Sequence, residues 1–335
     1  MTAAAALPPL PDDARVSVVV PALAAAGVVE RAIEAALAQG DLVAEVVVAA
    51  GDEATRDAAQ RSEDARVRVI GNPSGRTPDA LNAAIAASTH PVVVRVDAQS
   101  ILPPGYVARA VATLRRTGAG NVGGLQVPTA DAGFGRAVAA AMRSPVGSGG
   151  AAYRGGSEPG PADTVYLGVF RREALVAVGG YDPRFTRNQD AELNERLRRA
   201  GHTVWFDPEL AVTYAPRSSP RSLASQYLQY GRWRRLTARV HPGSLRARQL
   251  APPALVLAGT GVTVIAAVTR AWWLPAVGAG AYAAAVAAAV RAEAGDAPTT
   301  ARATAAVAIM HAAWGIGFLV GPPRGVSGGP RPADG

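Results

Sequence analysis

The 335-residue sequence contains no cysteine and no lysine. Without cysteine the chain can form no disulfide, no thiolate metal site and no cysteine nucleophile. Aromatic residues make up only 5% of the chain, and the few histidines are too far apart in the sequence to form a ligand pair: His90, His202, His241 and His311. These absences leave carboxylates and arginines as the side chains most able to carry chemistry.

Arginine supplies every basic side chain, and the net charge is +8. A basic chain can suit nucleic acid. However, eight arginines lie between Arg217 and Arg248, directly before an apolar C-terminal region. Basic residues beside hydrophobic spans are typical of membrane topology, so we expect membrane lipids as partners and no nucleic acid.

The N-terminal part, residues 1–14, predicts a disordered leader. It is short, broken by Pro8 and Pro9, and lacks the basic start and long apolar core of a signal peptide. A matching disordered tail is expected over residues 322–335.

Residues 15–215 alternate between strand and helix patterns and predict one α/β domain. Runs of valine between helical segments indicate parallel strands covered on both faces. A GxGxxG match at Gly118–Gly123 follows a helix and precedes a strand, the reverse of a dinucleotide-binding turn, so it predicts only a loop. The Gly-rich stretch Gly147–Pro161 is long enough for a mobile loop over a site.

Three apolar segments follow a basic amphipathic stretch at residues 216–249. Leu250–Thr269, Ala271–Val290 and Ala303–Gly321 each have about the 20 residues that a bilayer span requires. Buried alanine-rich helices are the alternative. We expect about three transmembrane helices over residues 250–321, with the N-terminal domain cytoplasmic and the chain end outside.

Asp97 closes a strand pattern that begins with the apolar run Pro91–Val94, and it should lie at the carboxyl edge of a buried strand, where open α/β sheets bind ligands. With Gln99 two positions later, it could hold Mg²⁺ or Mn²⁺ that bridges phosphate oxygens. The alternative is a strand-end Asp that caps the next turn.

Asp190 lies at the start of a predicted helix and is the candidate general base for an acceptor hydroxyl. A helix N-terminus favours the ionised carboxylate, which is the competent form. Acidic residues are common in first turns for structural reasons alone. Asp97 and Asp190 together suggest a sugar-nucleotide transferase.

The stretch Gln226–Arg235 mixes aromatic and arginine side chains. Arg232 could bind a diphosphate, and Trp233 could stack on a sugar or base. An amphipathic helix in the membrane interface, with Tyr227, Leu228 and Trp233 among lipid headgroups, is the compatible alternative.

Several motifs in order resemble the inverting family 2 glycosyltransferases with a GT-A fold, most closely the membrane-bound succinoglycan-biosynthesis type. The resemblance runs from Val16 to about Arg235 and continues into the apolar region. Its most specific pieces are Asn121–Gly124, Tyr153–Arg154, Asp163–Val165, Gly179–Asp182, Arg187–Asn194 and Gln229–Trp233. It implies a Rossmann-like mixed sheet that binds a nucleotide sugar, followed by a transmembrane helix bundle.

The resemblance also implies roles for single residues. Asp97 matches the first Asp of a metal-binding DxD motif, and Asp190 matches the catalytic base. Donor contacts are implied for Pro21, Ala22, Asp52, Arg76, Asn82, Asp97 and Gln99. Acceptor or diphosphate contacts are implied for Tyr153, Arg154, Gln189, Gln229, Arg232 and Trp233.

Two positions depart from the family pattern. Gln99 occupies the second DxD position, and an amide is a poorer ligand for a hard cation than a carboxylate. Ala50 stands where many relatives have an Asp that contacts uridine, so either Asp52, two residues on, or backbone groups would have to make this contact.

The sequence thus predicts an inverting hexosyltransferase of the inner (cytoplasmic) membrane, multi-pass, with its catalytic domain facing the cytoplasm. It would transfer a hexose, glucose from UDP-glucose for instance, to a polyprenyl-diphosphate-linked saccharide in exopolysaccharide or cell-envelope glycan synthesis. Two alternatives stay open: a polyprenyl-phosphate sugar synthase, and a catalytically inactive membrane scaffold that binds nucleotide sugars.

Overall fold

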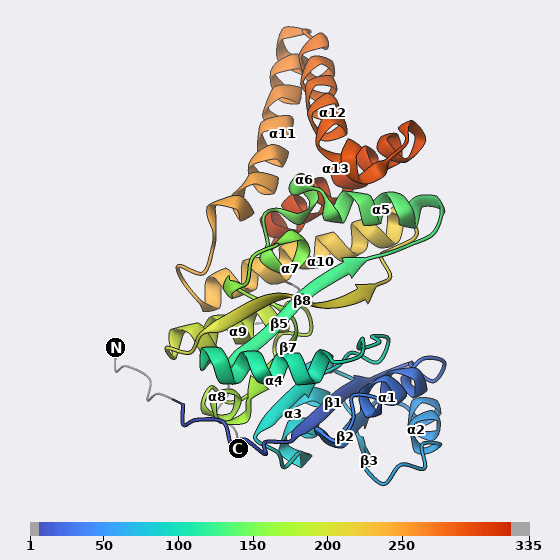
Figure 1. The fold of residues 1–335 in the computed structure, drawn as a ribbon. Helices are drawn as coiled ribbons and strands as arrows, with labels where there is room; N and C mark the ends of the chain where they lie inside the picture. Colours follow the sequence, from blue (N-terminus) through green and yellow to red (C-terminus); the bar gives the residue numbers. More distant parts are fainter. Residues whose placement is uncertain (1–6, 323–335) are drawn as a thin grey trace. The chain divides into compact units, whose positions relative to one another are not determined.

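The computed structural model describes residues 7–322 and contains an eight-stranded sheet. The strand order is β3-β2-β1-β4-β7-β5-β8-β6 (Figure 1). The strands are β1 (Val16–Ala22), β2 (Val43–Ala50), β3 (Val67–Gly71), β4 (Val92–Arg95), β5 (Asn121–Pro128), β6 (Gly160–Pro161), β7 (Tyr166–Arg171) and β8 (Val204–Tyr214).

The first four strands pair in parallel, as the valine runs predict. Strand β7 then pairs antiparallel with both β4 and β5, and β6 pairs antiparallel with β8, so the sheet is mixed. Because β1, β2, β3 and β4 are parallel, their carboxyl ends share one edge, where ligands bind in such sheets.

Valines of β1, β2 and β4 are fully buried because helices cover both faces of this part of the sheet. Val18, Val46 and Val94 pack in one core with α1 and α4, whereas α3 contacts β1 and β2. The helices between and after the strands are α1 (Val29–Leu37), α2 (Glu53–Gln60), α3 (Thr77–Ala87), α4 (Tyr106–Thr117), α8 (Arg172–Ala177) and α9 (Gln189–Arg199).

The chain divides into two compact units. Unit 1 contains residues 7–126 and 156–213, and unit 2 contains residues 127–155 and 214–322. Unit 2 is helical: α5 (Gly133–Arg143), α6 (Pro145–Ser148), α7 (Ala152–Gly155), α10 (Pro220–Val240), the 3-10 helix η1 (Ala247–Leu250), α11 (Ala251–Thr269), α12 (Trp273–Ala294) and α13 (Ala297–Val320). Three of its helices are long and apolar enough to cross a membrane.

Several boundaries differ from those predicted. Residues 127–155 group with the C-terminal helices, although the sequence placed them in the α/β domain. The expected mobile loop Gly147–Pro161 contains the end of α6, all of α7 and strand β6, so this segment is partly regular; its mobility stays a prediction. Leu10 and Ala14 are buried in the core of unit 1, so the ordered chain begins before residue 15. Residues 1–6 and the predicted tail after residue 322 lie outside the described part.

Candidate active site

Asp97 and Asp190 meet on one arginine at the carboxyl edge of the parallel strands. Arg95, the last residue of β4, donates from Nε and Nη2 to Asp97 Oδ1 at 3.1 and 2.8 Å. Its Nη1 donates to Asp190 Oδ1. The Arg95 side chain is only 6% exposed, so the protein holds it in place. Its guanidinium therefore fixes the positions of both carboxylates.

Asp190 is the second residue of α9, which begins after Asn188 in a left-handed conformation. Burial raises the pKa of Asp190, and the charge of Asp97 adds to this, while Arg95 and Tyr181 oppose it. Burial therefore outweighs the effect expected from the helix N-terminus. The side chain still keeps 42% of its surface exposed. A reachable carboxylate with a raised pKa is a stronger proton acceptor than an ordinary Asp.

Tyr181 is the neutral donor to Asp190. Its hydroxyl lies 3.4 Å from Asp190 Oδ1, and the Arg95 guanidinium carbon lies 5.8 Å from the centre of its ring. Both contacts of Asp190 therefore fall on Oδ1, which leaves Oδ2 as the oxygen for a substrate proton.

Asn82 of α3 holds Tyr181 by its backbone. The Asn82 side chain donates to Tyr181 O at 2.7 Å and accepts from Tyr181 N at 2.8 Å. A Cβ atom at the preceding Gly180 would lie 2.6 Å from Asn82 Oδ1. Asn82, predicted as a donor contact, thus positions the tyrosine beside the candidate base.

Tyr166, the first residue of β7, borders Asp97. Burial and then the negative charge of Asp97 raise the pKa of Tyr166 to about 12, so the phenol stays protonated at neutral pH. Its hydroxyl lies 3.4 Å from Ser100 Oγ.

Three of the four non-glycine residues with positive φ in the described chain flank this edge. They are Ala24 after β1, Leu167 next to Tyr166, and Asn188 before α9, with φ of 50°, 45° and 61°. Such conformations persist where surrounding contacts enforce them, and they concentrate at functional sites.

The predicted donor residues line the ends of neighbouring strands. Pro21 and Ala22 of β1 pair with Ala49 and Ala50 of β2. Asp52 caps α2: it accepts from Ala24 N at 2.7 Å and from both Thr55 N and Thr55 Oγ1, and these bonds lower its pKa. Both its oxygens are thus engaged in fixing the turn after β1.

Arg76 precedes α3 and pairs through Nε with Asp79 Oδ2 at 2.7 Å, with half of its side chain exposed. Gln189 is buried at the start of α9, whereas Gln99 is exposed. The sequence predicts Arg76 and Gln99 as donor contacts, and Gln189 as an acceptor or diphosphate contact.

The metal prediction rests on Asp97 alone. Within residues 7–322, no three His, Asp or Glu side chains come together as a metal site. Both bonds from Arg95 fall on Asp97 Oδ1, so Oδ2 is the oxygen that could contact a cation. This donor set fits a Mg²⁺ or Mn²⁺ ion that takes most of its oxygen ligands from a substrate diphosphate and water.

Unit 2 contains a separate cluster of arginine and tyrosine. Arg154 of α7 donates to Tyr153 Oη at 3.1 Å and to Tyr227 Oη at 3.0 Å, and it lies over both rings. Tyr227 belongs to α10, so this contact ties the predicted Tyr153–Arg154 segment to that helix.

Gln229, Arg232 and Trp233 also lie on α10. Arg232 donates from Nε to Gly321 O at 3.0 Å, and the Trp233 side chain is buried in unit 2 with 4% exposure. Tyr227 is buried too, so protein rather than lipid headgroups covers these aromatic rings.

Sequence reasoning missed Arg95, Tyr166 and Tyr181. A signal for Arg95 was present, because a charged residue interrupts the valine run of a strand that is buried on both faces. Tyr181 lies in the quoted motif Gly179–Asp182, but neither that motif nor any local pattern indicated that this tyrosine or Tyr166 would lie beside the two aspartates.

Comparisons with known proteins identify the family of the chain. Residues 11–235 match the family model described as glycosyltransferase like family 2. The succinoglycan biosynthesis protein ExoA of Rhizobium meliloti (strain 1021) is 34% identical over 285 residues, which cover 83% of this chain and 85% of that protein.

A solved structure shows the same fold. The mannosyltransferase PcManGT from Pyrobaculum calidifontis, in complex with GDP-Man and Mn²⁺, has a TM-score of 0.59 at 21% identity, covering 92% of this chain and 90% of that chain. The mixed sheet is therefore a GT-A-like domain. With two thirds of its length matched by the family model, the chain belongs to the family 2 glycosyltransferases.

Proposed function

We propose that this chain is a membrane-anchored inverting glycosyltransferase that moves a hexose from a nucleoside-diphosphate sugar to a polyprenyl-diphosphate-linked saccharide. UDP-glucose is the first donor to test, and the product would enter an exopolysaccharide or cell-envelope glycan. The observation that carries the proposal is the junction of Asp97 and Asp190 on Arg95. It brings a candidate diphosphate-side carboxylate and a candidate base to one edge of a GT-A-like sheet.

Asp190 acts as the general base in this mechanism. Its Oδ2 takes the proton of the acceptor hydroxyl while the hydroxyl oxygen attacks the anomeric carbon. The bond from that carbon to the diphosphate oxygen breaks on the opposite face, and its electron pair leaves with the diphosphate. Inversion follows because attack and departure occur on opposite faces.

Arg95 and Tyr181 orient the base. They hold Asp190 Oδ1, so the carboxylate cannot rotate freely and Oδ2 keeps its direction. Preorganised groups of this kind avoid reorganisation during the reaction. A Mg²⁺ or Mn²⁺ ion held by Asp97, when bound, supplies positive charge to the leaving diphosphate.

The membrane side of the proposal follows from the chemistry of the acceptor. A polyprenyl-linked saccharide stays at the bilayer, whereas nucleotide sugars are cytosolic, so the apolar C-terminal helices would hold the enzyme at the cytoplasmic face of the inner membrane. Acceptor or diphosphate binding by Tyr153, Arg154, Gln189, Gln229, Arg232 and Trp233 stays a prediction.

The test is release of nucleoside diphosphate by the purified full chain in detergent. Lipid extract, Mg²⁺ or Mn²⁺, and a panel of UDP-sugars and GDP-sugars are supplied, including GDP-mannose because PcManGT holds it. Wild type is compared with Asp190→Asn, Asp97→Ala and the control Glu30→Gln, which alters an exposed ion pair. Release that needs extract and both aspartates, and that Glu30→Gln retains, supports the proposal.

Other outcomes favour the alternatives. Activity that survives Asp190→Asn would favour a phosphate acceptor, which has little need of a base. Nucleotide-sugar binding without turnover across the panel would favour an inactive scaffold.

A further inference from the structure

The three apolar helices of unit 2 differ in packing, although length and composition do not separate them. Their mean hydropathies are 1.8, 1.6 and 1.7, for the segments Ala247–Thr269, Trp273–Ala294 and Ala297–Val320. Only 11% of each of the first two is buried in the protein, against 39% of the third. Helices α11 and α12 run side by side with their apolar surface exposed (Figure 1).

Helix α13 packs against α5 and α10, and this face is protein-covered. Ala303, Val307 and Met310 of α13 share one core with Ala137 and Val138 of α5. His311, in the middle of α13, places Nε2 3.0 Å from Val146 O of α6 and Nδ1 2.9 Å from Tyr282 Oη. Both ring nitrogens of His311 therefore have polar partners, one on the short helix α6 and one on α12.

Glycines bring the backbones of α10 and α13 into direct contact. A Cβ atom at Gly231 of α10 would lie 2.0 Å from Trp314 O, and one at Gly317 of α13 would lie 2.1 Å from Leu228 O. Because nothing fits between the two helices there, they must share one environment. If α13 crossed the bilayer, α10 would have to enter with it.

Helix α10 is unsuited to a bilayer, since it contains Arg232, Arg234, Arg235 and Arg239. Arginine within the hydrocarbon core is costly and rare. Arg232 bonds to the backbone at the end of α13, and Arg235 lies 5.2 Å from the Phe318 ring. At the other end of α13, Asp296 pairs with Arg136 of α5 at 3.2 Å.

We infer that only α11 and α12 cross the membrane, as a hairpin, and that α13 lies against α5 and α10 on the side where α11 enters. Two crossings return the chain to its starting side, so Val320 is on the same side as the GT-A-like domain. This replaces the expected three spans, which would leave the chain end outside.

The distribution of arginines gives the direction of the hairpin. The residues before α11 include Arg246 and Arg248 in addition to those of α10, whereas the turn between α11 and α12 contains only Arg270, beside Trp272 and Trp273. Arginine-rich flanks stay cytoplasmic, and tryptophans favour the interface. The turn is therefore on the outer face, and the end of α13 is cytoplasmic.

The absence of native cysteine makes the test direct. Single cysteines replace Ala108 on α4, Ala271 in the α11–α12 turn, Ala297 at the start of α13 and Val320 at its end, all in the full chain. A membrane-impermeant maleimide is applied to inverted and right-side-out vesicles. In parallel, a reporter that is active only in the cytoplasm is fused after Gly335. The wild-type chain gives the background.

We expect Ala108→Cys, Ala297→Cys and Val320→Cys to react in inverted vesicles, and Ala271→Cys to react only in right-side-out vesicles. Reaction of Val320→Cys together with Ala271→Cys would restore three spans and overturn the inference. So would reaction of Ala271→Cys together with Ala108→Cys, because the hairpin would then not cross. If Val320→Cys is unreactive in both preparations, the reporter decides: activity supports the inference and inactivity overturns it. None of these results depends on transferase activity.

Discussion

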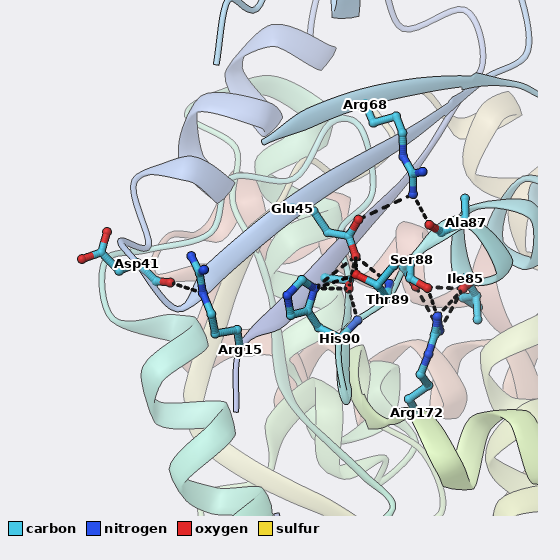
Figure 2. A network of polar contacts seen from close by, with 11 residues as sticks. Arg15, Asp41, Glu45, Arg68, Ile85, Ala87, Ser88, Thr89, His90 and Arg172 are labelled. Carbon is cyan, nitrogen blue, oxygen red and sulfur yellow. Dashed lines mark hydrogen bonds and ion pairs between the residues drawn. The ribbon is translucent and has the colours of Figure 1, made fainter. Parts of the chain in front are cut away.

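Glu45 and Asp190 are both carboxylates of unit 1 that contact an arginine and neutral donors, but they lie at opposite ends of the parallel strands. Glu45 is near the start of β2, where it accepts from Ser17 Oγ at 2.7 Å, from Thr89 N at 2.6 Å and from Thr89 Oγ1 at 2.9 Å (Figure 2). His90 Nδ1 and Arg68 add to this network at 3.2 and 3.5 Å.

The pKa values of the two acids move in opposite directions. Burial would raise the pKa of Glu45, but the hydrogen bonds from Ser17, Thr89 and His90 outweigh it and lower the value to about 2. Asp190 has one arginine and one distant hydroxyl, and burial keeps its pKa raised. A carboxylate surrounded by donors stabilises the fold, whereas one with few donors keeps an oxygen for chemistry.

The largest expected effect is the loss of catalysis in Asp190→Asn. Removing a general base lowers the rate by roughly 10² to 10⁴-fold, whereas thermal unfolding in detergent should change little because Asn can still accept from Arg95. The measurement is kcat together with the unfolding temperature. If Asp190→Asn keeps the wild-type kcat, Asp190 is not the base, and it does not differ from Glu45 in function.

Arg95→Gln should lower both the stability of the fold and the catalytic rate. Leaving partly buried acids without their cation costs about 3–5 kcal/mol in comparable buried pairs, and exposure of Asp190 puts this case at the lower end. The unfolding temperature and kcat should both fall, and Arg95→Lys should recover part of the stability by restoring the charge. Equal unfolding temperatures for wild type, Arg95→Gln and Arg95→Lys would contradict the role assigned to the guanidinium.

Glu45 should control stability at low pH rather than activity. Its folded pKa lies below the unfolded value of 4.5, so its contribution is fully present above that pH and is lost as the pH falls towards 2. The shift corresponds to roughly 3 kcal/mol at neutral pH. Unfolding temperatures from pH 7 to pH 3 should therefore fall more steeply for wild type than for Glu45→Gln, while kcat at pH 7 is retained. Parallel curves would mean that the network is not stabilising.

Tyr181→Phe should give the smallest effect. The hydroxyl at 3.4 Å from Asp190 lowers the pKa of that acid, so its removal should move the acid limb of the pH–rate profile to higher pH. A hydrogen bond of about 0.5–1.5 kcal/mol corresponds to a change in rate of no more than about tenfold. A limb that moves to lower pH would show that the hydroxyl does not act on Asp190.

The sequence predicts the parallel half of the sheet well because its valine runs are local signals. β1, β2 and β4 coincide with those runs. The antiparallel insertion of β7 between β4 and β5 depends on pairing between distant segments, which no local pattern records. Likewise β8 continues through Asp207, Pro208 and Glu209 to Tyr214, although these residues interrupt its apolar start.

The candidate site shows the same division. Asp97 and Asp190 could each be predicted from their places after a strand and at a helix start, but their meeting on Arg95 could not. The sequence also could not show that both carboxylate oxygens of Asp52 accept hydrogen bonds from the protein, from Ala24 N and from Thr55 N at the start of α2. Nor could it show that Trp233 is covered by protein, because burial of one face depends on the partner helix.

Asn82 links helix α3 to the backbone of Tyr181. Its side chain closes a two-bond bridge to the Tyr181 backbone, while Arg76 precedes the same helix at the edge predicted to contact the donor. The Tyr181 hydroxyl, 3.4 Å from Asp190 Oδ1, is thus tied to α3 through two side-chain hydrogen bonds. If the proposed donor contact of Arg76 is correct, a shift of α3 on donor binding would change the contact between this hydroxyl and the proposed base.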